Sequence, residues 1–196
     1  RQRSWCPMLR AVDVFLETDR LILRRFTQAD VDNLVDLDSD PDVMRFLTGG
    51  RPTPRHVVEN ELLPRLFAEY NSFAGSGRWA AVEKSTGEFV GWFALRPPEG
   101  SSGEVVELGY RLRKPFWGKG YGTEGSRALI RRGFTEFGVR RVYAETMAVN
   151  LASRRVLEKA GLKLVRTFHL TWDDPIDGAE YGEVEYELHR ADWLHH

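Results

Sequence analysis

The sequence predicts a single α/β (α+β) domain with about seven strands and about four helices. Three observations support this fold class. The 196 residues make a chain of about one domain in length. The sequence shows no internal repeat and no low-complexity linker. Strand-like and helix-like segments alternate in the order β-α-α-β-β-β-α-β-α-β-β. We expect residues 15–194 to form the domain and residues 1–14 to be an N-terminal tail or extension.

The first part of the chain predicts one strand and two helices. Branched residues favour a strand at residues 21–26. Thr27 followed by Asp30 resembles the capping box that starts a helix. A second helix spans about residues 54–70, where Pro64 is expected to kink or split it. The apolar faces of the two helices are Val31, Leu34, Val35 and Leu37 in the first and Val57, Val58, Leu62, Leu66 and Phe67 in the second.

The middle of the chain predicts three strands. Those at residues 79–83 and 89–95 are joined by a glycine-containing hairpin connection. A loop rich in Pro, Gly and Ser leads to the third, at residues 104–113. Its side chains alternate between the two faces of a sheet, with Val106, Leu108, Tyr110 and Leu112 on one face and Glu107, Arg111 and Arg113 on the other.

The last part predicts two helices and three strands. A helix ends at Phe137, a strand follows at residues 142–149, and a second helix covers residues 150–160. The two final strands lie at residues 162–172 and 184–188. Glycines that favour a left-handed conformation are expected to close the two helices, Gly138 and Gly161.

Composition excludes several classes of protein. The net charge of −1 argues against a general nucleic-acid binder. No segment approaches the roughly 20 apolar residues of a membrane helix. The single cysteine, Cys6, excludes an internal disulfide framework, and no histidine has metal-ligand spacing, so we expect no metal. One cysteine and no visible secretory signal lead us to expect a cytoplasmic protein.

One segment carries chemical specificity, the sequence WGKGYGT at residues 117–123. Three alternating glycines stand between a strand and a helix, where exposed N–H groups and the helix dipole can hold an anion. A phosphate or pyrophosphate site is the favoured interpretation, and a flexible turn is the alternative. The segment is not a Walker loop, because Lys119 is followed by Gly120 rather than Ser or Thr.

A dinucleotide-binding fingerprint is a second alternative. Residues 120–125 match G-x-G-x-x-G, and Glu145 lies near the expected acidic position. This reading would make the protein an NAD(P)-binding oxidoreductase. Only one βα unit follows the segment before the closing strands, fewer than such a domain normally has.

Several segments resemble motifs of the RimJ/RimL-like branch of the GNAT superfamily of acetyltransferases, and they occur in the same order along the chain as in that family. The glycine loop is similar to the acetyl-CoA pyrophosphate loop [QR]-x-x-G-x-[GA], with Trp117 at its first position. The other matches are LETDRLILR at 16–24, ELGY at 107–110, the N-x-x-S segment at 150–162 and the closing strand at 186–193.

The resemblance implies a GNAT fold, whose mixed, mostly antiparallel sheet splays near its middle, and acetyl-CoA as co-substrate. The pantetheine would bond the strand backbone in this gap, and the pyrophosphate would rest on the N–H groups of the loop. The implied cofactor-binding residues are Leu112, Arg113, Gly118, Lys119, Gly120, Tyr121, Gly122, Thr123, Asn150 and Ser153. The alternative for Asn150 is a plain helix N-cap, and the two roles are compatible.

The implied reaction is direct attack of a primary amine on the thioester in a ternary complex. Glu107 is the candidate base, acting directly or through water; the alternative is a salt-bridged strand carboxylate, with Arg111 on the same face. The tyrosine that many family members use as the acid is Leu157 here. Ser153 is the local substitute, as a hydrogen-bond donor to the sulfur. Glu145 is a lesser candidate.

The acceptor is expected to be a protein N-terminus or a small-molecule amine, and the protein a monomer or homodimer. A non-catalytic CoA-binding module is the other alternative, since the usual tyrosine is absent. The acidic run at residues 30–42 is expected to be a solvated helix face, and otherwise a surface that steers a cationic amine. Five aromatic residues are expected mostly in the core: Phe46, Phe67, Tyr70, Phe73 and Trp92.

Overall fold

A computed structural model describes residues 13–71 and 75–194. The predictions for Cys6, Phe73 and most of the N-terminal tail therefore lie outside the described residues. No helix in the described part of the chain is long and apolar enough to cross a membrane. The same residues contain no group of His, Cys, Asp and Glu side chains arranged to hold a metal ion.

Eight strands form one sheet in the order β1-β2-β3-β4-β5-β6-β8-β7. All neighbours are antiparallel except β5 and β6, so the expected mixed, mostly antiparallel sheet is confirmed. The strands are β1 Val14–Glu17, β2 Leu21–Arg24, β3 Gly77–Glu83, β4 Phe89–Arg96, β5 Val105–Leu112, β6 Arg141–Met147, β7 Lys163–Phe168 and β8 Glu183–His189. The additional strand is β1, and the strand expected to reach residue 172 ends at Phe168.

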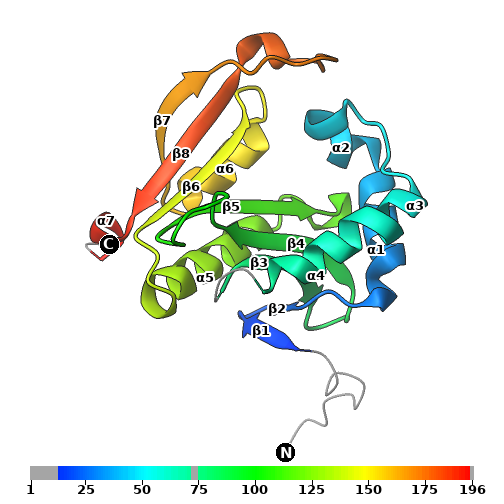
Figure 1. The fold of residues 1–196 in the computed structure, drawn as a ribbon, viewed down its shortest axis with the longest axis horizontal. Helices are drawn as coiled ribbons and strands as arrows, with labels where there is room; N and C mark the ends of the chain where they lie inside the picture. Colours follow the sequence, from blue (N-terminus) through cyan, green and yellow to red (C-terminus); the bar gives the residue numbers. More distant parts are fainter. Residues whose placement is uncertain (1–12, 72–74, 195–196) are drawn as a thin grey trace, which may run out of the picture.

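The sheet opens between β5 and β6. These strands pair only from Val105 to Glu107, whereas β4 stays paired with β5 up to Leu112 and β8 with β6 up to Met147. Among the described strands, none pairs with the β6-facing edge of β5 beyond Glu107. Figure 1 shows β6, β7 and β8 leaning away from β5. The expected splay is confirmed, and it leaves a strand edge that can hydrogen-bond an extended ligand.

The dinucleotide-binding alternative does not fit this sheet. A domain of that kind is built from parallel strands joined by crossover helices. In the described sheet, β5 and β6 form the only parallel pair. The glycine segment therefore follows a strand of a mostly antiparallel sheet and not a strand of a parallel dinucleotide-binding sheet.

Helices cover both faces of the sheet (Figure 1). One face carries α5 Tyr121–Glu136 and α6 Leu151–Lys159; the other carries α1 Val31–Ser39, α2 Pro41–Thr48, α3 Arg55–Val57 and α4 Leu63–Glu69. Phe93 of β4 packs toward α5 and α6, and its neighbour Trp92 packs toward α1–α4. The short α7 Arg190–Trp193 follows β8, and 3-10 turns lie at Gln28–Asp30, Lys114–Phe116 and Ala179–Tyr181.

One of these helical segments shows the expected break, and one helix was not expected. The segment at residues 54–70 is split by a π-helical turn, Val58–Leu62, directly before α4. Pro64 causes this expected break, because it has no N–H for the regular helix bond. The sequence pattern does not predict α2, which begins at Pro41 with the Asp40 carboxylate accepting from the Asp42 N–H at 2.9 Å.

The expectation that the acidic run is a solvated helix face is wrong for two of its members. Asp30 and Asp38 are 1% and 2% exposed. Burial alone would raise the pKa of Asp30. Two hydrogen bonds of 2.8 Å from Arg24, together with bonds from the Thr27 N–H and the Asn33 amide, instead lower it below its usual value. Phe67, expected in the core, is 37% exposed.

Candidate active site

The glycine loop joins the end of β5 to the start of α5. Gly118 and Gly120 have φ angles of 70° and 85°, which L side chains rarely adopt. Gly120 is the N-cap of α5. Among the described residues, none accepts a hydrogen bond from the backbone N–H groups of the first three residues of the helix, Tyr121, Gly122 and Thr123. These donors and the helix dipole form a site for an anion.

The next two glycines serve a different purpose. A Cβ on Gly122 would lie 3.3 Å from Val156, and one on Gly125 would lie 2.3 Å from the Phe93 ring. Because Gly122 and Gly125 have no side chain, α5 packs closely against α6 and β4. The alternating pattern therefore combines backbone freedom at the loop with close packing in the helix.

An arginine network holds the loop in place, and sequence reasoning did not assign it. The Arg20 guanidinium donates to the Lys119 carbonyl at 2.8 Å and to the Glu124 carboxylate at 2.6 Å, and it lies 4.1 Å from the centre of the Tyr121 ring. The Thr18 hydroxyl donates to the same carboxylate at 2.6 Å. Burial would raise the pKa of Glu124, but these hydrogen bonds lower it below its usual value.

The end of β5 has few backbone groups left for a ligand. The Arg113 N–H donates to the Val90 carbonyl at 2.9 Å, and its own carbonyl accepts from the Phe116 N–H at 3.0 Å. The Leu112 carbonyl accepts from the Trp117 indole N–H at 2.8 Å. The free part of the strand edge therefore lies at and before Leu112.

The start of α6 brings two hydroxyl groups together. Asn150 is its N-cap, since its side-chain oxygen accepts from the Ser153 N–H at 3.2 Å. The Ser153 hydroxyl lies 2.9 Å from the hydroxyl of Tyr110 on β5. Burial raises the pKa of Tyr110 to about 12, so this phenol stays protonated at neutral pH. Tyr110 belongs to the ELGY segment, but sequence reasoning gave it no role in the site.

Glu107 lies on the opposite face of β5, toward α1–α4. Its carboxylate is 2.9 Å from an Arg96 guanidinium nitrogen, and both side chains remain about one-third exposed. The suggested pairing with Arg111 is wrong, because Arg111 pairs with the buried Asp38 at 2.5 Å. Glu107 is thus accessible as a base and is also part of an ion pair.

Further carboxylates line the same face across the gap. The register places Glu107 beside Tyr143 and Glu145 beside Glu185 of β8, so these side chains share one face with Glu183. Burial raises the pKa of Glu145, and the charges of Glu107 and Glu185 add to the effect. Sequence reasoning identified Glu145 only as a lesser candidate and gave Glu183 and Glu185 no role. Strand alternation within residues 183–187 could have shown their common face.

Two buried carboxylates of this row differ in their partners. Glu183 and Glu185 are each 6% exposed. Glu185 lies 2.6 Å from both Arg141 and Arg166, whereas Oε1 of Glu183 has no hydrogen-bond partner among the described residues. Burial, with the charge of Glu145, raises the pKa of Glu183. The face therefore has negative charge that the described part of the chain does not compensate.

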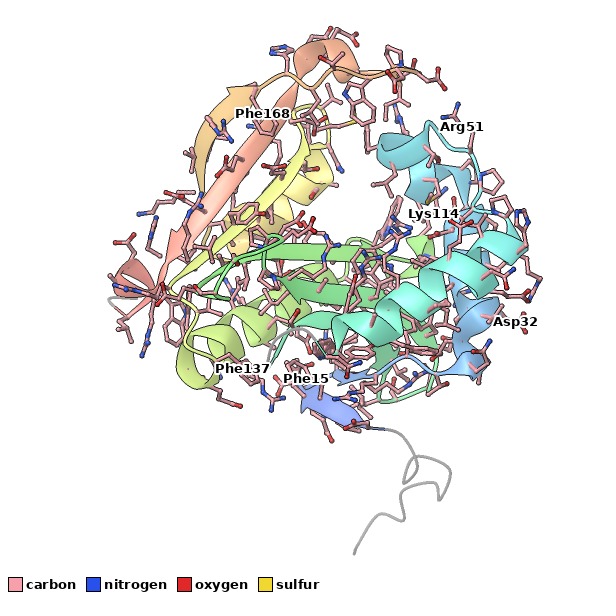
Figure 2. The ribbon with its side chains drawn as sticks, in the orientation of Figure 1. Phe15, Asp32, Arg51, Lys114, Phe137 and Phe168 are labelled. Atoms are coloured by element: carbon pink, nitrogen blue, oxygen red, sulfur yellow. The ribbon has the colours of Figure 1, made fainter. Side chains whose placement is uncertain are left out.

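A bridge spans the opened side of the sheet. Arg51, after α2 and labelled in Figure 2, lies 2.5 Å from Asp174 of the loop between β7 and β8. Ile176 of this loop packs near Gly49. Lys114, also labelled, forms an ion pair with Asp42. These contacts join α2 to both halves of the sheet, on the face that carries Glu107.

Comparisons with known proteins agree with this geometry. The family model described as "Acetyltransferase (GNAT) domain" matches residues 20–163. The chain is 39% identical over 167 residues to an Aspergillus fumigatus protein named FsC-acetyl coenzyme A-N(2)-transacetylase, covering 81% of this chain and 68% of that protein. It is 34% identical over 165 residues to the Bacillus subtilis protein YkkB, covering 82% and 91%.

Solved structures share the fold. A GNAT-family acetyltransferase from Bacillus anthracis aligns with a TM-score of 0.74 and 22% identity, covering 90% of this chain and 99% of that one. The RimL ribosomal L7/L12 alpha-N-protein acetyltransferase, solved in complex with coenzyme A, aligns with a TM-score of 0.74 and 16% identity, covering 90% and 98%.

Proposed function

Because the chain belongs to the GNAT acetyltransferase family, and is on that ground an N-acetyltransferase, we propose that it moves the acetyl group of acetyl-CoA to a primary amine. The acceptor is a protein N-terminus or a small-molecule amine, and the attack is direct, within a ternary complex. One observation carries the proposal: an anion site at the start of α5 lies next to the free edge of β5. The name of the Aspergillus relative, which specifies transfer to N(2), supports nitrogen as the acceptor atom.

The residues present fit the co-substrate. A diphosphate suits the N–H groups of the glycine loop, and a pantetheine chain with two amides suits the unpaired edge of β5. In this proposal the loop, Gly118, Lys119, Gly120, Tyr121, Gly122 and Thr123, holds the diphosphate. Leu112 and Asn150 contact the pantetheine, and Arg113 fixes the end of the strand through its bonds to β4 and to the turn that follows. The bound thioester supplies the activated acetyl group.

The remaining groups divide the proton transfers between the two faces of β5. The amine nitrogen forms a bond to the thioester carbon and the carbon–sulfur bond breaks. Glu107 takes the proton that the amine releases, directly or through water. Ser153, hydrogen-bonded to Tyr110, donates toward the sulfur as the thiolate leaves. Glu145 and Glu183 add negative charge where a cationic amine approaches.

The decisive experiment measures binding of CoA and NADH by calorimetry. Wild-type protein should bind CoA and not NADH. The variant Gly120→Asp should lose CoA binding, because it places a carboxylate at the anion site. Gly87→Asp is the matched control, since Gly87 has a similar φ of 76° in an open hairpin turn and its variant carries the same backbone strain. CoA affinity that Gly120→Asp leaves unchanged would refute the assignment of the loop.

A second measurement separates the enzyme from a non-catalytic CoA-binding module. Acetyl transfer to a panel of amines and peptide N-termini is followed by mass spectrometry. Acetylated product with any member supports the enzyme. CoA binding with no product from any member of the panel supports the module.

A further inference from the structure

A cavity of about 360 Å³ lies on the acceptor face, between α1–α4 and strands β3–β5. Its volume is that of a small-molecule site. Much of the wall is apolar, with Leu34, Met44, Leu62 and Leu66 among the lining residues. Three arginines, Arg65, Arg78 and Arg111, also line it, and we call this cavity the guanidinium pocket.

Positive charge is in excess around the guanidinium pocket. Asp38 is the acidic lining residue, and Arg111 already lies 2.5 Å from it. Arg78 lies 3.2 Å from Glu69, yet its Nε is buried with no hydrogen-bond partner among the described residues. Arg65 is exposed at the rim. These three arginines and two acids, Asp38 and Glu69, together leave a surplus of one positive charge.

The guanidinium groups also raise one another's electrostatic energy. The pKa of Arg78 falls to about 10, mainly because the side chain is buried; Glu69 opposes this shift, and the nearby charges of Arg96, Arg111 and Arg65 add to it. An anion bound among these groups would relieve their repulsion and satisfy the unpaired Nε. A carboxylate matches the planar fork of a guanidinium in size and geometry.

An aromatic wall adds to the recognition surface. The guanidinium carbons of Arg78 and Arg111 each lie 5.3 Å from the centre of the Trp92 ring. Together with the leucine and methionine side chains, this ring offers contact area to the body of a ligand. The lining is therefore suited to an apolar body that carries an anionic group.

The guanidinium pocket is close to the reacting groups. Arg111 directly precedes Leu112, where the free edge of β5 ends, and it lies on the same face as Glu107. Glu107 precedes Arg111 by four residues, a distance of about 13 Å along the strand. The two side chains and the water proposed at Glu107 span part of this distance, so an amine on a chain of several carbons can reach from the pocket to the gap in the sheet.

We propose that the guanidinium pocket binds the carboxylate end of the acceptor, so that the substrate is a small amine with a carboxylate on an apolar body. This inference rests on the proposed function and names the substrate class of the same site. The two ends of the acceptor meet complementary charge, the amine at the carboxylates around Glu107 and the anion at the arginines. A peptide N-terminus, which has no such anion at a fixed distance, is disfavoured.

The kinetic test compares two acceptors that differ in charge at their far end, ε-aminocaproate and aminohexanol. The wild-type enzyme should prefer ε-aminocaproate by about three- to tenfold in kcat/KM. Arg65→Gln should lose this preference, because it removes a rim charge without unpairing a buried partner. Arg131→Gln, on the exposed face of α5, is the matched control and should keep it. Equal rates for both amines in all three proteins would overturn the inference and leave acetyl transfer itself intact.

A binding test does not require turnover. Calorimetry with hexanoate and hexanol should show tighter binding of hexanoate and weaker binding by Arg65→Gln. Intrinsic tryptophan fluorescence, to which Trp92 contributes, is a second signal. Hexanoate that binds no better than hexanol would overturn the inference. Hexanoate that binds while no amine is acetylated would support the pocket and count against the proposed function. Efficient transfer to peptide N-termini without hexanoate binding would overturn the inference.

Discussion

Replacing Glu183 with glutamine should stabilise the protein, although Glu183 is a buried residue. The residue is 6% exposed, and one carboxylate oxygen has no hydrogen-bond partner among the described residues. Leaving a buried polar group unsatisfied costs about 1–3 kcal/mol, and more for a charged one. Glutamine keeps the shape but removes the charge. We expect a gain of about 1 kcal/mol, which for a chain of this length raises Tm by about 2–4 °C.

Glu185→Gln is the matched control with the opposite expected sign. It lies two residues along the same strand and is equally buried, but both of its oxygens are paired with arginines. Breaking a fully buried ion pair costs about 3–5 kcal/mol, and the partial exposure of Arg166 reduces this to about 2–3 kcal/mol. Tm should therefore fall by about 4–12 °C.

The assay is thermal unfolding of the three proteins as a function of pH. The pKa of Glu183 is raised above its ordinary value of 4.5, so its charged form destabilises the folded state above that raised pKa. The penalty disappears as pH falls toward 4.5. The advantage of Glu183→Gln should thus be largest at neutral pH and should vanish in acid. A loss of stability in Glu183→Gln at pH 7, or a gain that does not depend on pH, would refute the reasoning.

Three other variants test the remaining parts of the site. Glu107→Gln should lower turnover at neutral pH by about 100-fold or more with CoA affinity nearly intact, and an unchanged pH–rate profile would remove Glu107 from the mechanism. Arg20→Gln should weaken CoA binding about tenfold in calorimetry, because the Lys119 carbonyl and the Glu124 carboxylate lose the guanidinium donor. Arg131→Gln is the control, and equal CoA affinity in the two variants would contradict the role of the Arg20 contacts. Gly125→Ala should destabilise the fold by about 1–3 kcal/mol in denaturant unfolding, because its Cβ would lie 2.3 Å from the Phe93 ring. Gly133→Ala, whose Cβ would have its nearest contact at 3.3 Å, should be close to neutral. Similar free energies of unfolding for the two variants would show that the Phe93 ring moves freely.

Much of the fold could be predicted because its signals are local. The capping residues, the break at Pro64 and the alternation in β5 each depend on residues a few positions apart. The helix α2 was not predicted, because its Asp-Pro start lies within a run of acidic residues that also suits a solvated face. The burial of Asp38 follows from Arg111, which lies 73 residues further along the chain, and no local pattern reports such a partner.

The same distinction applies to the site. The glycine loop is visible in the sequence, since a left-handed backbone conformation and a free helix terminus require particular residue types at fixed spacing. Arg20 and Glu124 are 104 residues apart, and the guanidinium pocket combines side chains from several helices and three strands. These features depend on tertiary contacts, so sequence reasoning could assign them no role.

Trp117 shows how the structure explains a departure from the family pattern. The acetyl-CoA loop usually has Gln or Arg at this position, and tryptophan has neither the charge of arginine nor the flexible chain of either residue. All three side chains carry an N–H donor. Here the indole N–H donates to the Leu112 carbonyl at 2.8 Å, which ties the start of the loop to the end of β5. The substitution therefore keeps a donor that positions the loop against the strand edge, and it does not weaken the case for CoA binding.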